Sequence, residues 1–122
     1  MEKLTIKDIA KMAGVSHTED GYRTGLAYFT RCIKAKKSIA TGILCISDHF
    51  ALGVMQAAVE TGVDIPGQIS LIGFDDVSFA SLPKIQLTTI SQPKEEICDA
   101  AVRTLEELIH AAEPAPVSCK TI

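Results

Sequence analysis

The sequence predicts an α/β protein with parallel strands. Three short apolar runs, at residues 41–47, 69–74 and 86–91, have the length of buried strands. Segments of helical periodicity lie before the first run, between the first two and after the third. Strands that alternate with helices form parallel sheets, and helices cover such sheets on both faces. The composition agrees, since 47% of the 122 residues are hydrophobic and 22% are charged. We therefore expect a three-layer α/β domain.

The helix before the first strand is expected at about 19–37. Its apolar side chains recur at helical steps: Tyr22, Leu26, Phe29 and Ile33. Two glycines, Gly21 and Gly25, lie in its first turns. They are expected to weaken the start of the helix, because glycine is a poor helix former.

The helix between the first two strands begins after Ser47 and ends at Gly62. The Ser47 hydroxyl can cap the free N–H groups of the first turn, and Gly62 can take the left-handed conformation that ends a helix. The buried side is expected to consist of Phe50, Ala51, Val54, Met55, Ala58 and Val59.

The last helix is expected at about 93–112. Pro93 suits its first turn, where Glu95 and Glu96 complement the positive end of the helix dipole. One face is apolar: Ile97, Ala101, Leu105, Leu108 and Ala112. Between the second and third strands, the run 75–85, "DDVSFASLPKI", is expected to be a loop.

The N-terminal segment has the pattern of the first half of a helix-turn-helix. Thr5 and Asp8 form a weak capping box, and Gly14 can end the short helix that follows. The apolar face of this helix consists of Ile6, Ile9, Ala10 and Ala13. Ser16 can cap the next helix. Residues 1–37 carry eight Lys and Arg against four Asp and Glu, which suits contact with phosphate and equally suits a solvated helix face.

Polar side chains follow the first two strands at the points where these strands end. Ser47 and Asp48 follow the first strand, and Asp75 and Asp76 follow the second. Ligands of open parallel sheets bind at the carboxyl ends of the strands, and a carboxylate can accept hydrogen bonds from two hydroxyls of a sugar or another polyol. A purely structural role explains the same pattern: Asp48 then only starts a helix, and Asp76 only caps a loop. The spacing does not decide between a ligand-binding site and this structural role.

Other kinds of site find little support. His17, His49 and His110 lie on separate predicted elements, so no catalytic triad is expected, and the glycines lack the spacing of a nucleotide-binding loop. The cysteines are far apart and predict neither a metal site nor disulfides, only buried or unreactive thiols: Cys32, Cys45, Cys98 and Cys119. No cofactor is expected. No apolar run approaches the ~20 residues of a membrane span, and no secretory signal follows Met1, so we expect a cytoplasmic location.

Two stretches resemble a known family. "LTIKDIAKMAGVS", residues 4–16, resembles the opening of LacI/GalR-family bacterial transcription repressors. Residues 41–93, with the motifs "SDHFALGVMQAA", "IPGQISLIGFDD" and "LTTISQP", resemble the C-terminal subdomain of the effector-binding core in the same family. "EDGYRTG", residues 19–25, resembles the helix that precedes the first of these strands.

The resemblance implies a DNA-binding regulator with a periplasmic-binding-protein-like fold that responds to a sugar or a nucleobase and forms a homodimer through its core. It places Thr5 at a DNA-backbone contact, and Ser16 and His17 at the start of the recognition helix, where the family contacts phosphate and bases. It also places Asp75 on the aspartate that holds effector hydroxyls, and Ser47 where the family usually has asparagine.

The family pattern contains segments that this sequence lacks: the rest of the recognition helix, the hinge helix, the N-terminal subdomain of the core and its last strand. We therefore expect an internally deleted regulator, with a helix-turn-helix fragment at 1–17 and an incomplete effector-binding and dimerisation subdomain at 18–122. Its effector ligands are expected to be Ser47, Asp48 and Asp75, and its binding to operator DNA is expected to be impaired. The alternative is a small-molecule-binding or self-associating half-domain that does not bind DNA. An enzyme is not expected.

Overall fold

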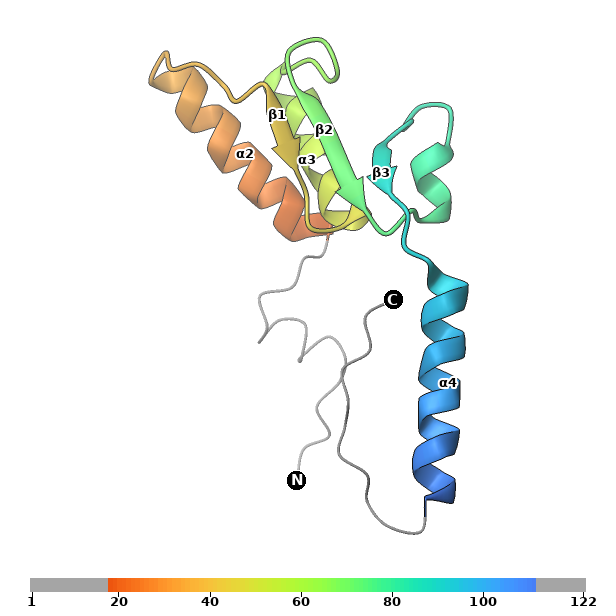
Figure 1. Cartoon of the computed structure of the whole chain (residues 1–122). Helices are drawn as coiled ribbons and strands as arrows, with labels where there is room; N and C mark the ends of the chain where they lie inside the picture. The colour runs from red at the N-terminus through yellow and green to blue at the C-terminus, as the bar shows by residue number, and fades with distance from the viewer. Residues whose placement is uncertain (1–17, 112–122) are drawn as a thin grey trace. The chain divides into compact units, whose positions relative to one another are not determined.

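The computed structural model of the chain describes residues 18–111 (Figure 1). The predicted helix-turn-helix fragment, with Thr5, Ser16 and His17, lies outside the described residues, and so does Cys119. The chain divides between Ser91 and Gln92 into two compact units, and each is described here by itself.

The first unit is a parallel α/β arrangement, as predicted. Helix α2, Thr18–Lys34, precedes strand β1, Gly42–Leu44, and helix α3, Asp48–Thr61, leads to strand β2, Ser70–Phe74. Strand β3, Thr88–Ile90, completes a three-stranded sheet of order β1-β2-β3, in which both pairs are parallel. Each strand lies within the run predicted for it and is shorter.

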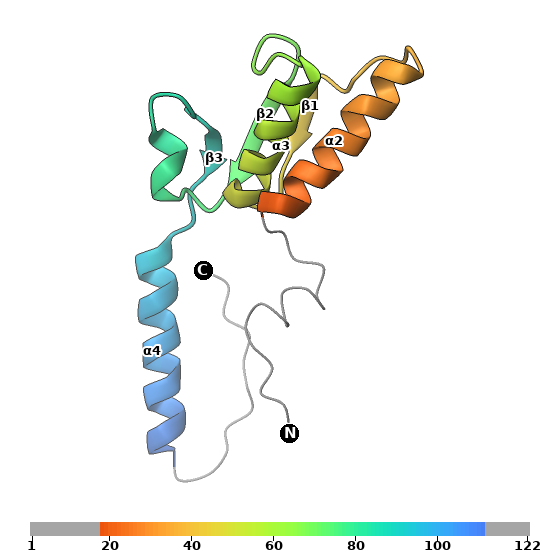
Figure 2. The same ribbon diagram turned by 180° about the vertical axis from the view of Figure 1, so that it is seen from behind.

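Helix α3 lies on one face of this sheet. Figure 1 views the strands in front of α3, and Figure 2 shows α3 in front of the strands. The core between them includes the fully buried Phe29 of α2, Ala51 and Ala57 of α3, and Ile69, which directly precedes β2. The predicted caps of α3 are confirmed: the Phe50 N–H donates to the Ser47 Oγ at 3.2 Å, and Gly62 has φ 73°.

Two glycines of α2 have a different role from the one predicted. Gly21 and Gly25 do not interrupt the helix; both are buried inside it. A side chain at Gly21 would overlap the Phe50 carbonyl group of α3, and one at Gly53 of α3 would overlap the Thr18 carbonyl oxygen of α2. These glycines therefore let the two helix backbones approach closely, and the stability lost in helix propensity is offset by packing.

The far side of the sheet differs from the prediction of strands buried on both faces. In β2, Leu71 and Gly73 are buried, whereas Ser70 and Ile72 are exposed. Alternation of this kind marks a sheet that is covered on one face. The exposed face carries large apolar side chains, and Leu44 is 69% exposed there.

Two further differences concern single segments. Val59 of α3 was predicted to be buried, but it is 82% exposed, because it lies on the side of α3 away from the core. The predicted loop after β2 contains a 3-10 helix, η1, Ser78–Ser81, whose Ala80 is buried.

The second unit contains helix α4, Lys94–His110. Its bounds agree with the predicted helix, and none of its residues is buried, the predicted apolar face within 94–110 included. Leu105, for example, is 58% exposed. No helix within 18–111 is long and apolar enough to cross a membrane.

Candidate functional site

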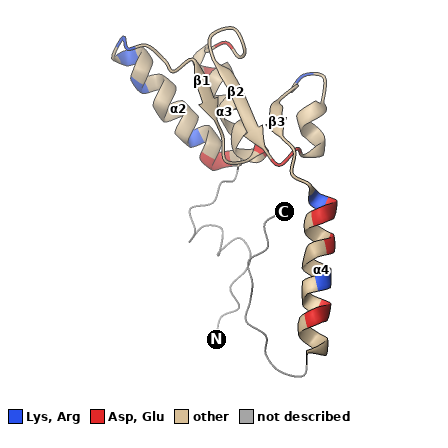
Figure 3. Cartoon of the chain, viewed as in Figure 1, with Lys and Arg blue, Asp and Glu red and all other residues tan. Residues whose placement is uncertain are grey.

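The candidate residues lie where β1 and β2 end, and the structure separates them into a buried and a more exposed layer. Asp48 is fully buried, whereas Ser47 and Asp75 are partly exposed and Asp76 is exposed. Acidic residues gather at this end of the unit (Figure 3).

The Asp48 carboxylate connects three parts of the fold. Its Oδ2 accepts a hydrogen bond from the Val77 N–H at 2.9 Å, and its Oδ1 accepts one from the Thr89 hydroxyl at 2.5 Å. Because Asp48 also opens α3, the positive end of that helix stabilises its charge. The carboxylate thus joins α3 to the segment after β2 and to β3.

Room for this carboxylate comes from Gly73 in β2. A side chain at Gly73 would overlap the Asp48 Oδ1 and the side chain of Leu87. A glycine inside a strand weakens the strand, so its presence indicates a close approach by another group. Here that group is the buried carboxylate.

The segment after β2 is fixed by three successive backbone N–H groups. The Asp75 N–H donates to the Ile90 carbonyl oxygen at 3.0 Å, and the Asp76 N–H donates to the Thr89 Oγ1 at 3.3 Å. The third donor is the Val77 N–H, which binds Asp48. These bonds hold Asp75 at φ 111° and Asp76 at φ 50°. Residues other than glycine rarely adopt positive φ, and such conformations concentrate at functional sites.

Ser47 and Asp75 therefore lie at the partly exposed edge where β1 and β2 end, and Asp48 is buried behind them. The interpretation of Asp48 as a direct effector ligand does not fit its burial, since protein atoms enclose its carboxylate. Thr89 and Gly73 were missed by the sequence analysis. Thr89 is 41 residues from Asp48, and no local pattern links the two.

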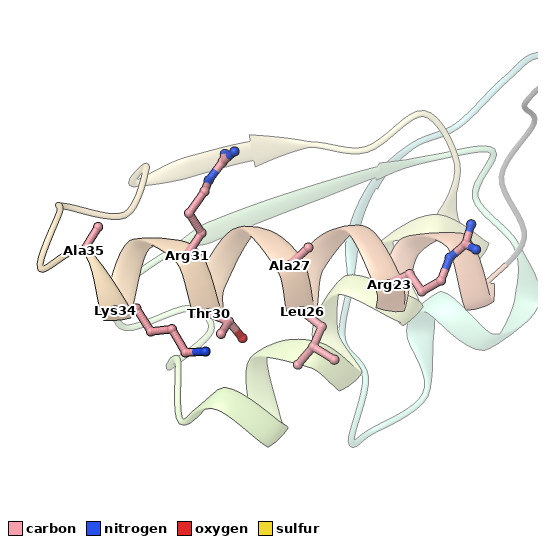
Figure 4. A pocket seen from close by; sticks show the side chains of 7 residues that line it. All are labelled: Arg23, Leu26, Ala27, Thr30, Arg31, Lys34 and Ala35. Atoms are coloured by element: carbon pink, nitrogen blue, oxygen red, sulfur yellow. The ribbon is translucent and has the colours of Figure 1, made fainter.

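Two hollows in the described part of the chain lie away from this site. One, of about 720 Å³, runs along α2 and is lined by Arg23, Leu26, Ala27, Thr30, Arg31, Lys34 and Ala35 (Figure 4). Its lining comes from one helix and the residue after it, so no opposing wall encloses a ligand. Another, of about 470 Å³, lies at the opposite end of the strands, where Ser70 and Thr88 begin β2 and β3.

Neither a reactive cysteine nor a metal site is found among the described residues. Cys32 and Cys45 are buried and Cys98 is exposed, and all three are free thiols. Burial raises the pKa of the Cys45 thiol to about 11, so it stays protonated near neutral pH. Between residues 18 and 111, no group of three or more His, Cys, Asp or Glu side chains could hold a metal ion.

Comparisons with known proteins agree with this fold. The family described as "Periplasmic binding protein-like domain" matches residues 2–121. The match includes residues on both sides of the predicted domain boundary between residues 17 and 18. It does not test this boundary, which stays a prediction. The HTH-type transcriptional regulator MalR of Clostridium butyricum is 37% identical over 90 residues, which cover 72% of this chain and 27% of that protein. MalR of Streptomyces coelicolor is 42% identical over 78 residues, 64% of this chain and 22% of that protein.

Solved structures show the same relationship. A LacI-family transcriptional regulatory protein from Corynebacterium glutamicum has a TM-score of 0.66 and 26% identity, over 82% of this chain and 39% of that one. A LacI-family regulator from Arthrobacter sp. FB24, in complex with lactose, shares the fold with a TM-score of 0.67 and 22% identity, over 95% of this chain and 45% of that one. The chain spans about a quarter of the length of the two MalR regulators. It belongs to the periplasmic binding protein-like domain family and, within it, to the LacI-type regulators.

Proposed function

We propose that this chain is the effector-sensing part of a LacI-type transcriptional regulator, and that Asp75 and Ser47 bind a sugar or another polyol at the strand ends. The observation that carries the proposal is the conformation of Asp75, which hydrogen bonds from three successive backbone N–H groups fix at the carboxyl end of β2 with φ 111°. A carboxylate held in this way can accept hydrogen bonds from two neighbouring hydroxyls. The lactose complex of the Arthrobacter regulator supports a sugar as the ligand class.

Asp48 has a positioning role in this proposal. Its bonds to Val77 and Thr89 fix the segment that carries Asp75, so its loss would displace the effector ligand without removing a direct contact. Pre-organised binding groups lose less entropy when a ligand binds, so this arrangement favours affinity.

Isothermal titration calorimetry with a panel of mono- and disaccharides tests the effector site. We expect one class of sugar to bind saturably, and Asp75→Asn to lower the affinity by about tenfold or more, because a charged hydrogen-bond acceptor is lost. Asp64→Asn is the matched control, since Asp64 is an exposed carboxylate that precedes β2 at the other end of the sheet. Equal affinities for the parent and Asp75→Asn would contradict the proposal.

DNA binding is the second part of the proposed function. Thr5, Ser16 and His17 are the proposed contacts with operator DNA. The proposed location of such a regulator is the cytoplasm. A gel-shift assay at low salt with DNA from upstream of its own gene tests them. A shift that Ser16→Ala and His17→Ala together abolish supports DNA binding. Its absence in the parent would contradict it and favour a sensing half-domain.

We also propose a homodimer formed through α3. Val59 is an exposed apolar residue of this helix, and Leu52 on the same helix is partly exposed. Sedimentation velocity should show a dimer in the parent and a shift toward monomer in Val59→Glu, because burial of an unpaired carboxylate in the interface is unfavourable. An unchanged sedimentation coefficient in Val59→Glu would exclude this interface.

A further inference from the structure

A notch interrupts the sheet of the first unit at the amino ends of β2 and β3. Thr88, the first residue of β3, pairs with Ile72, so Ser70 and Leu71 of β2 have no partner in β3. A hollow of about 470 Å³ lies between these residues and the segment 84–88, and we call it the notch. In Figure 1 this segment belongs to the loop that leads into β3. The volume lies in the range of small-molecule sites.

The floor and the rim of the notch differ in chemistry. The floor is apolar, and its residues Met55, Ile65 and Ile85 are partly buried and pack against the core. The rim is polar, with four exposed side chains: Ser70, Lys84, Gln86 and Thr88. None of the residues that line the notch is acidic, so the formal charge of its lining is that of the Lys84 ammonium.

Backbone hydrogen bonds fix the wall that faces β2. The Gln86 N–H donates to the Leu82 carbonyl oxygen at 2.9 Å, and the Leu87 N–H donates to the Ala80 carbonyl oxygen at 2.9 Å. Gln86 has φ 42°, a conformation that residues other than glycine rarely adopt and that concentrates at functional sites. The notch is therefore preformed, and its walls come from separate segments of the chain, unlike those of the hollow along α2.

The polar groups of the rim suit an anion. The Lys84 ammonium forms no ion pair or hydrogen bond within residues 18–111, so its charge is available to a ligand. The hydroxyl-bearing Ser70 and Thr88 lie on the same face of the sheet, because Thr88 pairs with Ile72, two residues after Ser70. A carboxylate accepts hydrogen bonds from an ammonium group and from hydroxyls, and one cation matches a monoanion. The apolar floor favours a ligand whose remainder is hydrocarbon.

We propose that the notch binds a small monocarboxylate with an apolar body, with its carboxylate beside Lys84 and its hydrocarbon part on the apolar floor. The proposed sugar site lies at the carboxyl ends of the strands, so the notch is a second site with its own class of ligand. The two sites are tested independently, because Asp75→Asn removes a group from one and Lys84→Gln removes a group from the other.

Titration of the isotope-labelled full chain with 3-phenylpropionate, followed by 1H–15N correlation spectra, tests this site. We expect saturable shifts of amides within residues 65–72 and 84–88, with a Kd in about the millimolar range, as for other ligands of this size. 3-Phenylpropanol lacks the charge, and acetate lacks the apolar body. Each should bind at least about fivefold more weakly than 3-phenylpropionate.

Two substitutions at exposed positions of the rim change the notch without altering the core. Lys84→Gln should weaken 3-phenylpropionate about fivefold and leave 3-phenylpropanol unaffected, because it removes only the charge. Ser70→Phe should abolish the binding of both, because the larger side chain fills the notch. Lys37→Gln is the matched control, since Lys37 is an exposed lysine between α2 and β1, and it should leave both affinities unchanged. Unchanged amide positions in α2 show that each variant keeps the fold.

Three results would overturn the proposal. The first is an absence of saturable shifts with 3-phenylpropionate, and the second is an affinity for it that Lys84→Gln leaves unchanged. The third is a set of shifts centred on residues 23–35, which would assign the carboxylate to the hollow that Arg23 and Arg31 line on α2. None of these results bears on the proposed sugar site, which Asp75→Asn tests.

Discussion

At the residue scale, the proposed effector-binding residues Ser47 and Asp75 depend on a buried carboxylate, that of Asp48, which is not part of their surface. Asp48 accepts hydrogen bonds from Val77 and Thr89, and Thr89 in turn accepts one from the Asp76 N–H. The positions of Ser47, Asp48 and Asp75 at one end of the sheet could be predicted, because parallel strands end at a common edge. The burial of Asp48 could not be predicted, because it depends on Thr89, a distant residue in the sequence.

Removal of the Thr89 hydroxyl tests this network. Thr89→Val keeps the shape of the side chain but leaves the buried Asp48 carboxylate with one donor fewer. We expect a loss of about 1–3 kcal/mol in the free energy of unfolding, measured by urea denaturation. Thr88→Val is the control, because Thr88 is exposed on the neighbouring position of β3, and we expect a change within about 0.5 kcal/mol. Equal effects of the two substitutions would argue against a structural role for the Thr89–Asp48 bond.

Cys45 gives the stability a defined dependence on pH. Burial raises the pKa of its thiol from 9.0 in the unfolded chain to about 11 in the fold. The protonated thiol therefore favours the fold fully below pH 9, and this contribution is lost as the pH rises from 9 toward about 11. The free energy of unfolding should fall more steeply across this range in the parent than in Cys45→Ala. Parallel pH profiles for the two proteins would contradict the assigned cause.

At the element scale, packing explains where the sequence patterns succeeded and where they failed. The bounds of α3 followed from its caps, Ser47 and Gly62, which act locally. The role of Gly21 could not be inferred from helix propensity, because its contact with Phe50 lies in another helix. The apolar face of α4 was recognised correctly as a pattern, but periodicity does not show what covers a face.

The close contact of α2 with α3 predicts an unusual effect of alanine. Gly53→Ala would raise helix propensity, yet its methyl group would overlap the Thr18 carbonyl oxygen, so we expect a net loss of about 1–3 kcal/mol of stability in urea denaturation. Gly42→Ala makes the same substitution where no atom lies within 4 Å, and it should leave the urea midpoint nearly unchanged. A gain in stability for Gly53→Ala would show that the helices separate easily.

At the scale of the whole molecule, the first unit carries the proposed effector-binding residues at one edge of its sheet and exposed apolar side chains on one face of it. The family and the fold could be predicted, because motifs such as "IPGQISLIGFDD" encode both a strand and the aspartates that follow it. The exposure of this apolar face could not be predicted. An apolar run predicts that a strand packs on something, but not how many layers the chain supplies.

The central claim is that a sugar binds at the carboxyl ends of β1 and β2. Titration of the isotope-labelled full chain with the best-binding saccharide, followed by 1H–15N correlation spectra, tests it most directly. We expect saturable shifts confined to residues 46–50, 73–77 and 89–91, and their loss in Asp75→Asn. Shifts that centre on the hollow beside Ser70 and Thr88, or shifts that persist in Asp75→Asn, would contradict the claim.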